Sequence, residues 1–200
     1  MVKNIIVATY NAHKAREIAQ IWSDYNLGLT IVSLTNLGAR MELEETGNSF
    51  AENALQKALQ VATTTSYPVL ADDSGLIVDA LNGRPGIFSA RYAGLHSTDL
   101  QNNKKLISEL KSIPYEQRKA RFKCVMALIW TDKKIYQEEG VCEGFITLQS
   151  AGDNGFGYDP YFFLPEYNMT MAQLNPEIKN KISHRAIALR KIAQKIQKLL

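Results

Sequence analysis

The sequence has few cysteines and histidines for its length. Cys124 and Cys142 are the only cysteines among 200 residues, so a disulfide framework is excluded and two free thiols are expected. The three histidines, His13, His96 and His184, do not have zinc-ligand spacing with the cysteines. Any bound metal would therefore be held by oxygen ligands, which favours magnesium.

The sequence also lacks a long apolar run and a strong charge imbalance. No stretch reaches the roughly 20 apolar residues that a membrane helix needs, and the apolar N-terminal run is shorter than that of a signal peptide. Lysine and arginine number 23 and aspartate and glutamate 20, and the net charge of +3 is too small to predict nucleic-acid binding. No repeat, low-complexity tract or linker divides the chain. We therefore expect one cytoplasmic domain, residues 1–200, with no nucleic-acid or membrane partner.

Short apolar runs alternate with amphipathic segments along most of the chain. The apolar runs predict strands at residues 3–8, 29–34, 68–73, 76–81, 121–130 and 134–141, the last two as a hairpin. Helical spacing predicts a helix after Lys14, one opened by a capping box of Ser49 and Glu52, and one over residues 99–111. The residues of the first and third helices that we expect to face the core are Ala15, Ile18, Ala19, Trp22, Leu100, Ile107 and Leu110.

Two adjacent carboxylates, Asp72 and Asp73, follow the apolar run at residues 69–71. We expect the strand to stop here, and a buried strand that ends in carboxylates at a turn is where open α/β sheets bind ligands. Adjacent carboxylates also raise each other's pKa, so one of them could act as a base beside a metal. The same segment continues to Arg91, which places acid for a metal and base for a phosphate close together in sequence.

Lysines near two predicted helices are candidate anion ligands. Residues 9–14 connect the first strand to a helix whose N-terminus can receive an anion, and Lys14 adds a full positive charge there. The alternative is an ordinary surface lysine. No glycine-rich Walker loop is present, so that class of nucleotide-binding protein is excluded. The polar face of the second helix carries Asn53, Gln56, Lys57 and Gln60, and a lysine on such a face is normally solvent-exposed.

A glycine-rich loop at residues 152–160 carries Phe156 and Tyr158. Glycines let backbone approach a ligand closely, and the two rings could stack on a nucleobase. They could equally be tucked into the core, and the sequence leaves both readings open. Further along, Lys179, His184 and Arg185 offer phosphate or base contacts near two helix starts.

Acidic and basic side chains in separate segments suit the hydrolysis of a nucleoside triphosphate. Glu44, Asp72 and Asp73 could hold a magnesium ion that neutralises phosphate oxygens and activates a water. Cationic side chains would hold the charge that moves to the leaving group. A carboxylate within hydrogen-bond reach could take the proton of the water. The alternative for Glu44 and its acidic neighbours is an ordinary solvated cluster before a helix.

Five motifs occur in one order over nearly the whole chain: ATYNAHKAREI, EETGNSFAENALQKA, ADDSGLIVDALNGRPGIFSARYAG, GFGYDP and ISHR. Together they resemble the inosine triphosphate pyrophosphatase family, whose members clear unusual purine nucleotides. The resemblance implies magnesium-assisted attack of water at the α-phosphorus of ITP, dITP or XTP, which releases the monophosphate and pyrophosphate. It also implies a homodimer and an α/β fold with an elongated mixed β-sheet flanked by helices, in two lobes around a central substrate cleft.

The resemblance also implies a role for each matching residue. It makes Asp73 the proton acceptor and places magnesium at Glu44 and Asp73, with Asp72 close by. The substrate-binding residues that it implies are Thr9, Asn11, Lys14, Lys57, Ser74, Phe156, Gly157, Tyr158, Asp159, Lys179, His184 and Arg185. We expect His184 and Arg185 to donate to the 6-oxo group of the base, so that ATP is rejected. The first loop departs from the commonest family pattern at Tyr10, Ala12 and His13, where small residues or glycine are usual.

Two alternative functions stay open. One is a pyrophosphatase that acts on pyrimidine or other modified nucleoside triphosphates. The other is a non-catalytic protein that binds nucleotides or RNA. The acidic residues argue against the second, because a pure anion binder gains nothing from carboxylates beside phosphate.

Overall fold

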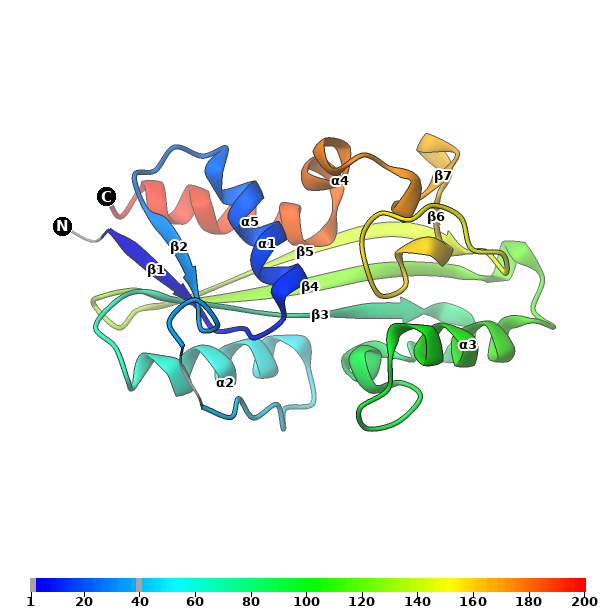
Figure 1. Ribbon diagram of the computed structural model, residues 1–200, viewed down its shortest axis with the longest axis horizontal. Coiled ribbons are helices and arrows are strands. Elements are labelled where there is room, and N and C mark those ends of the chain that lie inside the picture. Colours follow the sequence, from blue (N-terminus) through cyan, green and yellow to red (C-terminus); the bar gives the residue numbers. More distant parts are fainter. Residues whose placement is uncertain (1–2, 39–40) are drawn as a thin grey trace. The chain divides into compact units, whose positions relative to one another are not determined.

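The computed structural model describes residues 3–38 and 41–200. In this part of the chain, one sheet has the strand order β2-β1-β3-β4-β5-β6-β7. The strands are β1 (Asn4–Val7), β2 (Thr30–Ser33), β3 (Val69–Val78), β4 (Lys119–Ile129), β5 (Ile135–Ile146), β6 (Phe162–Leu164) and β7 (Met169–Thr170). The α-helices are α1 (Ala12–Ser23), α2 (Phe50–Ala62), α3 (Asp99–Leu110), α4 (Pro176–Ile182) and α5 (His184–Gln197). Figure 1 labels them along the chain.

The sheet is mixed. β1 is parallel to both β2 and β3, whereas β6 is antiparallel to both β5 and β7. Parallel strands need crossover connections, and α1 and α2 supply them between β1, β2 and β3. The predicted α/β class with a mixed sheet is therefore confirmed, and so is the predicted hairpin of β4 and β5.

The chain divides into two compact units. The first contains Met1–Asp73, Cys124–Gly140 and His184–Leu200, and the second contains Ser74–Lys123 and Val141–Ser183. The first unit has α1 and α5 on one face of its strands and α2 on the other (Figure 1). No described helix in either unit has the length and apolar character that a membrane crossing requires.

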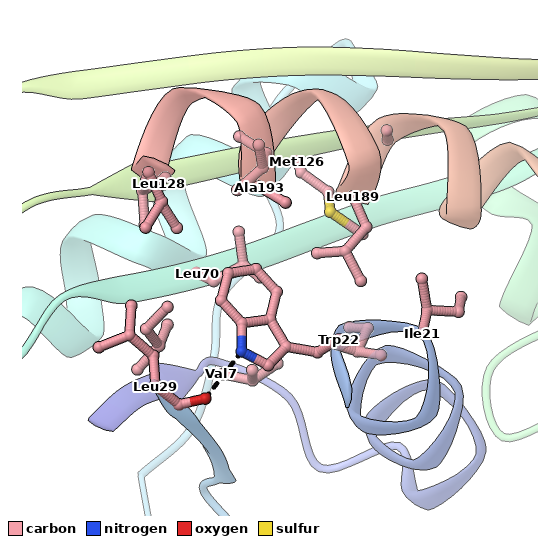
Figure 2. Close-up of a cluster of buried hydrophobic side chains, with 14 of the residues drawn as sticks. Val7, Ile21, Trp22, Leu29, Leu70, Met126, Leu128, Leu189 and Ala193 are labelled. Atoms are coloured by element: carbon pink, nitrogen blue, oxygen red, sulfur yellow. Dashed lines mark hydrogen bonds between the residues drawn. The ribbon is translucent and has the colours of Figure 1, made fainter. Parts of the chain in front are cut away.

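The core of the first unit lies between its strands and helices α1 and α5 (Figure 2). Trp22 packs there against β1 and β3, and its indole Nε1 donates to the carbonyl of Leu29 at 2.8 Å. Leu189 of α5 completes this layer, and burying each such side chain contributes about 1.5–3 kcal/mol. Ile21 is buried in the core, whereas Ala19, which we expected to be buried, is exposed.

The core of the second unit forms around β3, β4 and β6. The rings of Phe122 and Phe162 lie 4.5 Å apart between centroids, and Leu106 and Leu110 of α3 pack into the same cluster. Leu100 was predicted to face this core but is 73% exposed. The prediction is wrong because α3 turns other residues inward, and its buried set is Asn102, Asn103, Leu106 and Leu110.

Local sequence sets the starts of the helices. Asn11 caps α1, and its side chain accepts from the amides of His13 and Lys14. Ser49 caps α2 as predicted, but the second half of the expected capping box differs, because the carboxylate of Glu52 bonds to the amide of Asn48 at 2.7 Å. These caps satisfy amides that the first turn of a helix leaves without partners.

Strand β3 does not stop at the two aspartates. It continues to Val78, and a 3-10 turn at Asp79–Leu81 replaces the separate strand predicted for residues 76–81. The expectation failed because side chains far along the chain bond both carboxylates, so a strand can carry them in its interior. Val7, the last residue of β1, pairs with Leu70. Asp72 and Asp73 thus lie just past the carboxyl end of β1, an edge at which open sheets bind ligands.

Candidate functional site

Asp72 lies in a buried cluster of charges within the first unit. Its carboxylate is 1% exposed and lies 3.0 Å from the ammonium of Lys14 and 3.5 Å from the guanidinium of Arg185. Arg185, itself 2% exposed, also forms an ion pair with Glu17 of α1. Lys14 is therefore not an ordinary surface lysine, because α1 delivers it to a buried anion.

The charges around Asp72 decide its protonation. Burial alone would raise the pKa of Asp72, but the charges of Lys14 and Arg185 outweigh it and hold that pKa well below the usual range. Burial alone would likewise lower the pKa of Arg185, but Glu17 and Asp72 raise it. Both groups are consequently charged, and together they hold the end of α1 that carries Lys14.

Asp73 lies beside a different helix. Its Oδ2 accepts from the Asn53 side-chain amide at 3.0 Å, and its Oδ1 is 3.9 Å from the Lys57 ammonium. Both partners come from α2 and are buried. Successive side chains of a strand point to opposite faces, and this explains why Asp72 meets α1 and α5 while Asp73 meets α2. A lysine on a polar helix face is normally solvent-exposed, but the side chain of Lys57 is buried.

The pKa of Asp73 is raised. Burial is the largest cause, the Lys57 charge opposes it, and the nearby Glu45 adds to the increase. We expected adjacent carboxylates to raise each other's pKa, but the carboxylate that raises the pKa of Asp73 is Glu45. For Lys57, burial alone would lower the pKa, but Asp72 and Glu45 foremost raise it. Lys57 is thus a buried cation between the carboxylates of Glu45 and Asp73.

The residues of the acidic segment before α2, 41–48, alternate between half-buried and exposed, which is the pattern of an extended chain. Glu45 is half-buried and forms an ion pair with Lys57, whereas Glu44 is exposed. The main chain of Glu44 is held by Gln60, whose side-chain amide bonds both its N–H and its carbonyl at 3.0 Å. The carboxylate that lies beside Lys57 and near Asp73 is therefore that of Glu45, the immediate neighbour of the predicted Glu44.

The donors near Asp73 fit a hard divalent cation. Over residues 3–38 and 41–200, no cluster of three or more His, Cys, Asp or Glu side chains could hold a metal ion. Magnesium does not need one, since it commonly takes one or two carboxylates and completes its octahedral shell with waters and substrate phosphates. Asp73, with a raised pKa and Glu45 nearby, is a carboxylate whose charged form a cation would stabilise.

The loop at residues 155–159 is fixed by side chains of the second unit. Oδ2 of Asp159 accepts from the ammonium of Lys179 at 2.7 Å and from the amide of Phe156 at 3.0 Å. That ammonium also lies 5.2 Å from the ring centroid of Phe156. The main chain of Gly157 bonds to the side chains of Asp99 and Asn103.

The two aromatic residues of this loop have different surroundings. Tyr158 is buried in the core of the second unit, and its hydroxyl donates to the carbonyl of Ser89 at 2.7 Å. Phe156 is only half-buried. The core reading therefore holds for Tyr158, and Phe156 is the ring with a partly open surface.

The predicted site residues divide between the two units. Thr9, Asn11, Lys14, Glu44, Lys57, Asp72, Asp73, His184 and Arg185 belong to the first, and Ser74, Phe156, Gly157, Tyr158, Asp159 and Lys179 to the second. Within the first unit, charged contacts link Lys14, Asp72 and Arg185, and a second set links Lys57 and Asp73. Thr9 is buried, and its Oγ1 accepts from the Asn11 amide at 3.1 Å. Ser74 follows Asp73 in β3 and is half-buried, and His184 is buried at the start of α5.

Sequence reasoning gave no role to three residues that bond this constellation: Glu17, Glu45 and Asn53. Asn53 precedes Lys57 by four residues, and that spacing places both on one helix face. Glu17 follows Lys14 by three residues in the same way. The helical spacing was therefore a usable signal, but nothing in the sequence named Asp73 and Arg185 as the partners.

The chain is similar in sequence and structure to known proteins. The profile of the Ham1 family matches residues 5–195. A "dITP/XTP pyrophosphatase" from Bacillus cereus is 48% identical over 197 residues, which cover 98% of this chain and 95% of that protein. One of the same name from Geobacillus kaustophilus is 46% identical over 199 residues, which cover 100% of this chain and 97% of that protein.

Solved structures agree with this result. The Ham1 protein of Staphylococcus aureus has a TM-score of 0.86 and 38% identity, and the match covers 99% of this chain and all (100%) of that one. A nucleoside-triphosphatase / dITP/XTP pyrophosphatase from Mycobacterium abscessus has a TM-score of 0.75 and 41% identity. The match covers 94% of this chain and 98% of that one. With a profile match over nearly its whole length and relatives at this identity, the chain belongs to the Ham1 family.

Proposed function

We propose that this chain hydrolyses the purine nucleoside triphosphates ITP, dITP and XTP to the monophosphate and pyrophosphate. The observation that carries the proposal is Asp73, a buried carboxylate with a raised pKa that Asn53 and Lys57 hold at the carboxyl edge of β1. The full-length relatives named dITP/XTP pyrophosphatases support the same substrate class.

Asp73 is the proposed proton acceptor. In the metal-free protein its raised pKa makes Asp73 a stronger base than an ordinary aspartate, and a cation bound beside it would lower that pKa again. The Asn53 amide donates to Oδ2 and so fixes the direction of the carboxylate. In this role Asp73 takes the proton of the water that attacks the α-phosphorus.

Two lysines are the proposed ligands of the triphosphate. Lys14 stands at the first turn of α1, where the helix dipole also favours an anion, and Asp72 and Arg185 keep it there. Lys57 is a buried cation beside Asp73. Positive charge at these points stabilises the negative charge that moves onto the pyrophosphate leaving group.

Magnesium is the proposed cofactor, with Glu44 and Asp73 as its ligands and Glu45 beside them. When bound, the ion would neutralise phosphate oxygens and lower the pKa of a water. Asp72 was also predicted near the metal. Its charge is engaged by Lys14 and Arg185, so we assign it to holding Lys14.

Recognition of the base is proposed for the segment Phe156–Asp159 with Lys179, His184 and Arg185. Phe156 offers a partly open ring face, and Asp159 and Lys179 hold its loop. Arg185 is bonded to Glu17 and Asp72, so its contact with a 6-oxo group stays a prediction. The homodimer and the cytoplasmic location also stay predictions.

A nucleotide panel in ¹⁸O-labelled water tests the proposal. Purified protein with Mg²⁺ should convert ITP, dITP and XTP to pyrophosphate and a monophosphate that carries the label, and it should leave ATP largely intact. Orthophosphate as the first product, or label in pyrophosphate, would contradict attack at the α-phosphorus. Preference for pyrimidine nucleotides, or binding without turnover, would favour one of the two alternatives.

Asp73→Asn tests the assigned base in the same assay. It should abolish turnover while ITP still binds, whereas Asp79→Asn, a change of the same kind at an exposed ion pair, should keep activity. Wild-type rates in the Asp73 variant would remove this residue from the chemistry.

A further inference from the structure

One face of α2 bonds the acidic segment residue by residue. Five contacts join them in antiparallel order, from the first turn of the helix to its last: Glu52 to Asn48, Asn53 to Gly47, Gln56 to Thr46, Lys57 to Glu45, and Gln60 to Glu44. Every residue of the segment from 44 to 48 therefore has a partner on the same helix.

The dimensions of a helix and of an extended chain explain this match. Eight helical steps, from Glu52 to Gln60, advance about 12 Å at about 1.5 Å per residue. Four extended steps, from Asn48 to Glu44, advance about 13 Å at about 3.3 Å per residue. A helix face with partners at positions i, i+4 and i+8 can therefore bond an extended segment over its whole length without losing register.

Two glutamines bond the main chain of the segment. The amide of Gln60 accepts from the N–H of Glu44 and donates to its carbonyl, both at 3.0 Å. Gln56 accepts from the N–H of Thr46 at 3.0 Å and donates to its hydroxyl at 3.0 Å. These contacts are independent of the charge on the glutamates, so they fix the backbone rather than the carboxylates.

The register decides which glutamate pairs with Lys57 and which stays exposed. Side chains of an extended segment alternate in direction, so a slip by one residue would place Glu44 or Thr46, instead of Glu45, opposite Lys57. In the present register Glu45 meets Lys57, and Glu44 is exposed and so accessible to a ligand from solvent. The two carboxylates thus have separate surroundings although they are neighbours in sequence.

We propose that Gln56 and Gln60 are positioning residues that set this register and thereby the affinity of the site for a divalent cation. The proposal rests on the proposed function, in which Glu44 and Asp73 hold the metal. The glutamines touch neither metal nor nucleotide in this scheme. They act by holding the backbone of Glu44 at a fixed place along α2.

Gln60→Met tests the proposal, because methionine keeps the length and helix propensity of the side chain and removes both hydrogen bonds. The matched control is Gln194→Met, at an exposed position of α5. The first readout is hydrogen exchange at the Glu44 amide in the protein without metal or nucleotide. It should accelerate at least about tenfold in Gln60→Met and stay unchanged in the control, with a small change in melting temperature in both.

The second readout is the affinity for Mn²⁺ in the presence of inorganic pyrophosphate, from the electron paramagnetic resonance of the free ion. It should weaken by about tenfold or more in Gln60→Met, as for other residues that orient metal ligands. Activity at saturating Mg²⁺ should recover toward wild type, since the lost affinity is offset by concentration.

Unchanged exchange at Glu44, or faster exchange with unchanged Mn²⁺ affinity, would overturn the proposal. Failure of the proposed function looks different, because the wild-type protein would then release no pyrophosphate from ITP in the nucleotide panel. A large fall in the melting temperature of Gln60→Met would also count against a positioning role, because the substitution would then weaken the whole fold rather than the metal site alone.

Discussion

Replacing Asp72 by asparagine should strongly destabilise the protein. The change keeps the shape of the side chain and removes the negative charge that Lys14 and Arg185 share. Arg185 is 2% exposed, so its cation cannot gain water in exchange. Glu17 still pairs with Arg185, but the positive charges of Arg185 and Lys14 are then no longer balanced by Asp72.

The size of the effect follows from burial. Removing one partner of a buried ion pair costs about 3–5 kcal/mol, because an uncompensated charge stays in the interior. For a chain of 200 residues, 1 kcal/mol shifts the melting temperature by roughly 2–4 °C, so the loss should be on the order of 6–20 °C. The control is Asp79→Asn, whose pair with Arg121 is 46% and 33% exposed and should contribute no more than about 1 kcal/mol.

The effect should also depend on pH. Because the folded protein holds the pKa of Asp72 below its ordinary 3.8, the carboxylate contributes stability that is present above that value and is lost as pH falls through the folded pKa. The difference between wild type and Asp72→Asn should therefore be full near neutral pH and shrink below about pH 4. Urea denaturation of metal-free and nucleotide-free protein at several pH values measures it. A loss no larger than that of Asp79→Asn near neutral pH would refute this account of the cluster.

Three further predictions concern other parts of the chain. Burial raises the pKa of Cys124 and of Cys142 to about 12, so iodoacetamide at pH 8 should label neither thiol until urea unfolds the protein, and mass spectrometry would detect early labelling. Gly144→Ala should cost about 1–3 kcal/mol, because a Cβ there would lie 2.5 Å from the Phe163 carbonyl, and an unchanged melting temperature would contradict that close approach. Tyr158→Phe should lose about 1 kcal/mol, because the hydroxyl no longer donates to Ser89, yet keep the KM for ITP, because the proposed base recognition by Phe156–Asp159 does not use that hydroxyl; a large rise in KM at unchanged stability would indicate a direct contact of the hydroxyl with substrate.

Much of the fold could be predicted because its signals are local. Apolar spacing predicted α1, the cap at Ser49 predicted the start of α2, and the turn before Lys134 predicted the β4–β5 hairpin. Leu100 shows where this reasoning fails. Apolar spacing alone did not reveal that Asn102 is buried in α3, where its side chain bonds the main chain of Ala90 and Ala93.

The continuation of β3 could not be predicted, because its cause is not local. Two consecutive aspartates are poor strand residues, and of the two cations that neutralise Asp72, Lys14 and Arg185, the second lies 113 residues away. The partner of Asp73, Asn53, is 20 residues away. Residue type and order were enough to identify the candidate site, but the pairing of its charges follows from the fold.

Because Asp72 and Asp73 point to opposite faces of β3, these neighbouring residues contact different helices. Substitutions in α2 change the contacts of Asp73 and leave the ion pairs of Asp72 with Lys14 and Arg185 in place. Substitutions in α5 act the other way. The contacts can therefore be altered one helix at a time, but the charges of Lys57 and Lys14 act across β3, so a change of charge on one face also moves the pKa of the aspartate on the other.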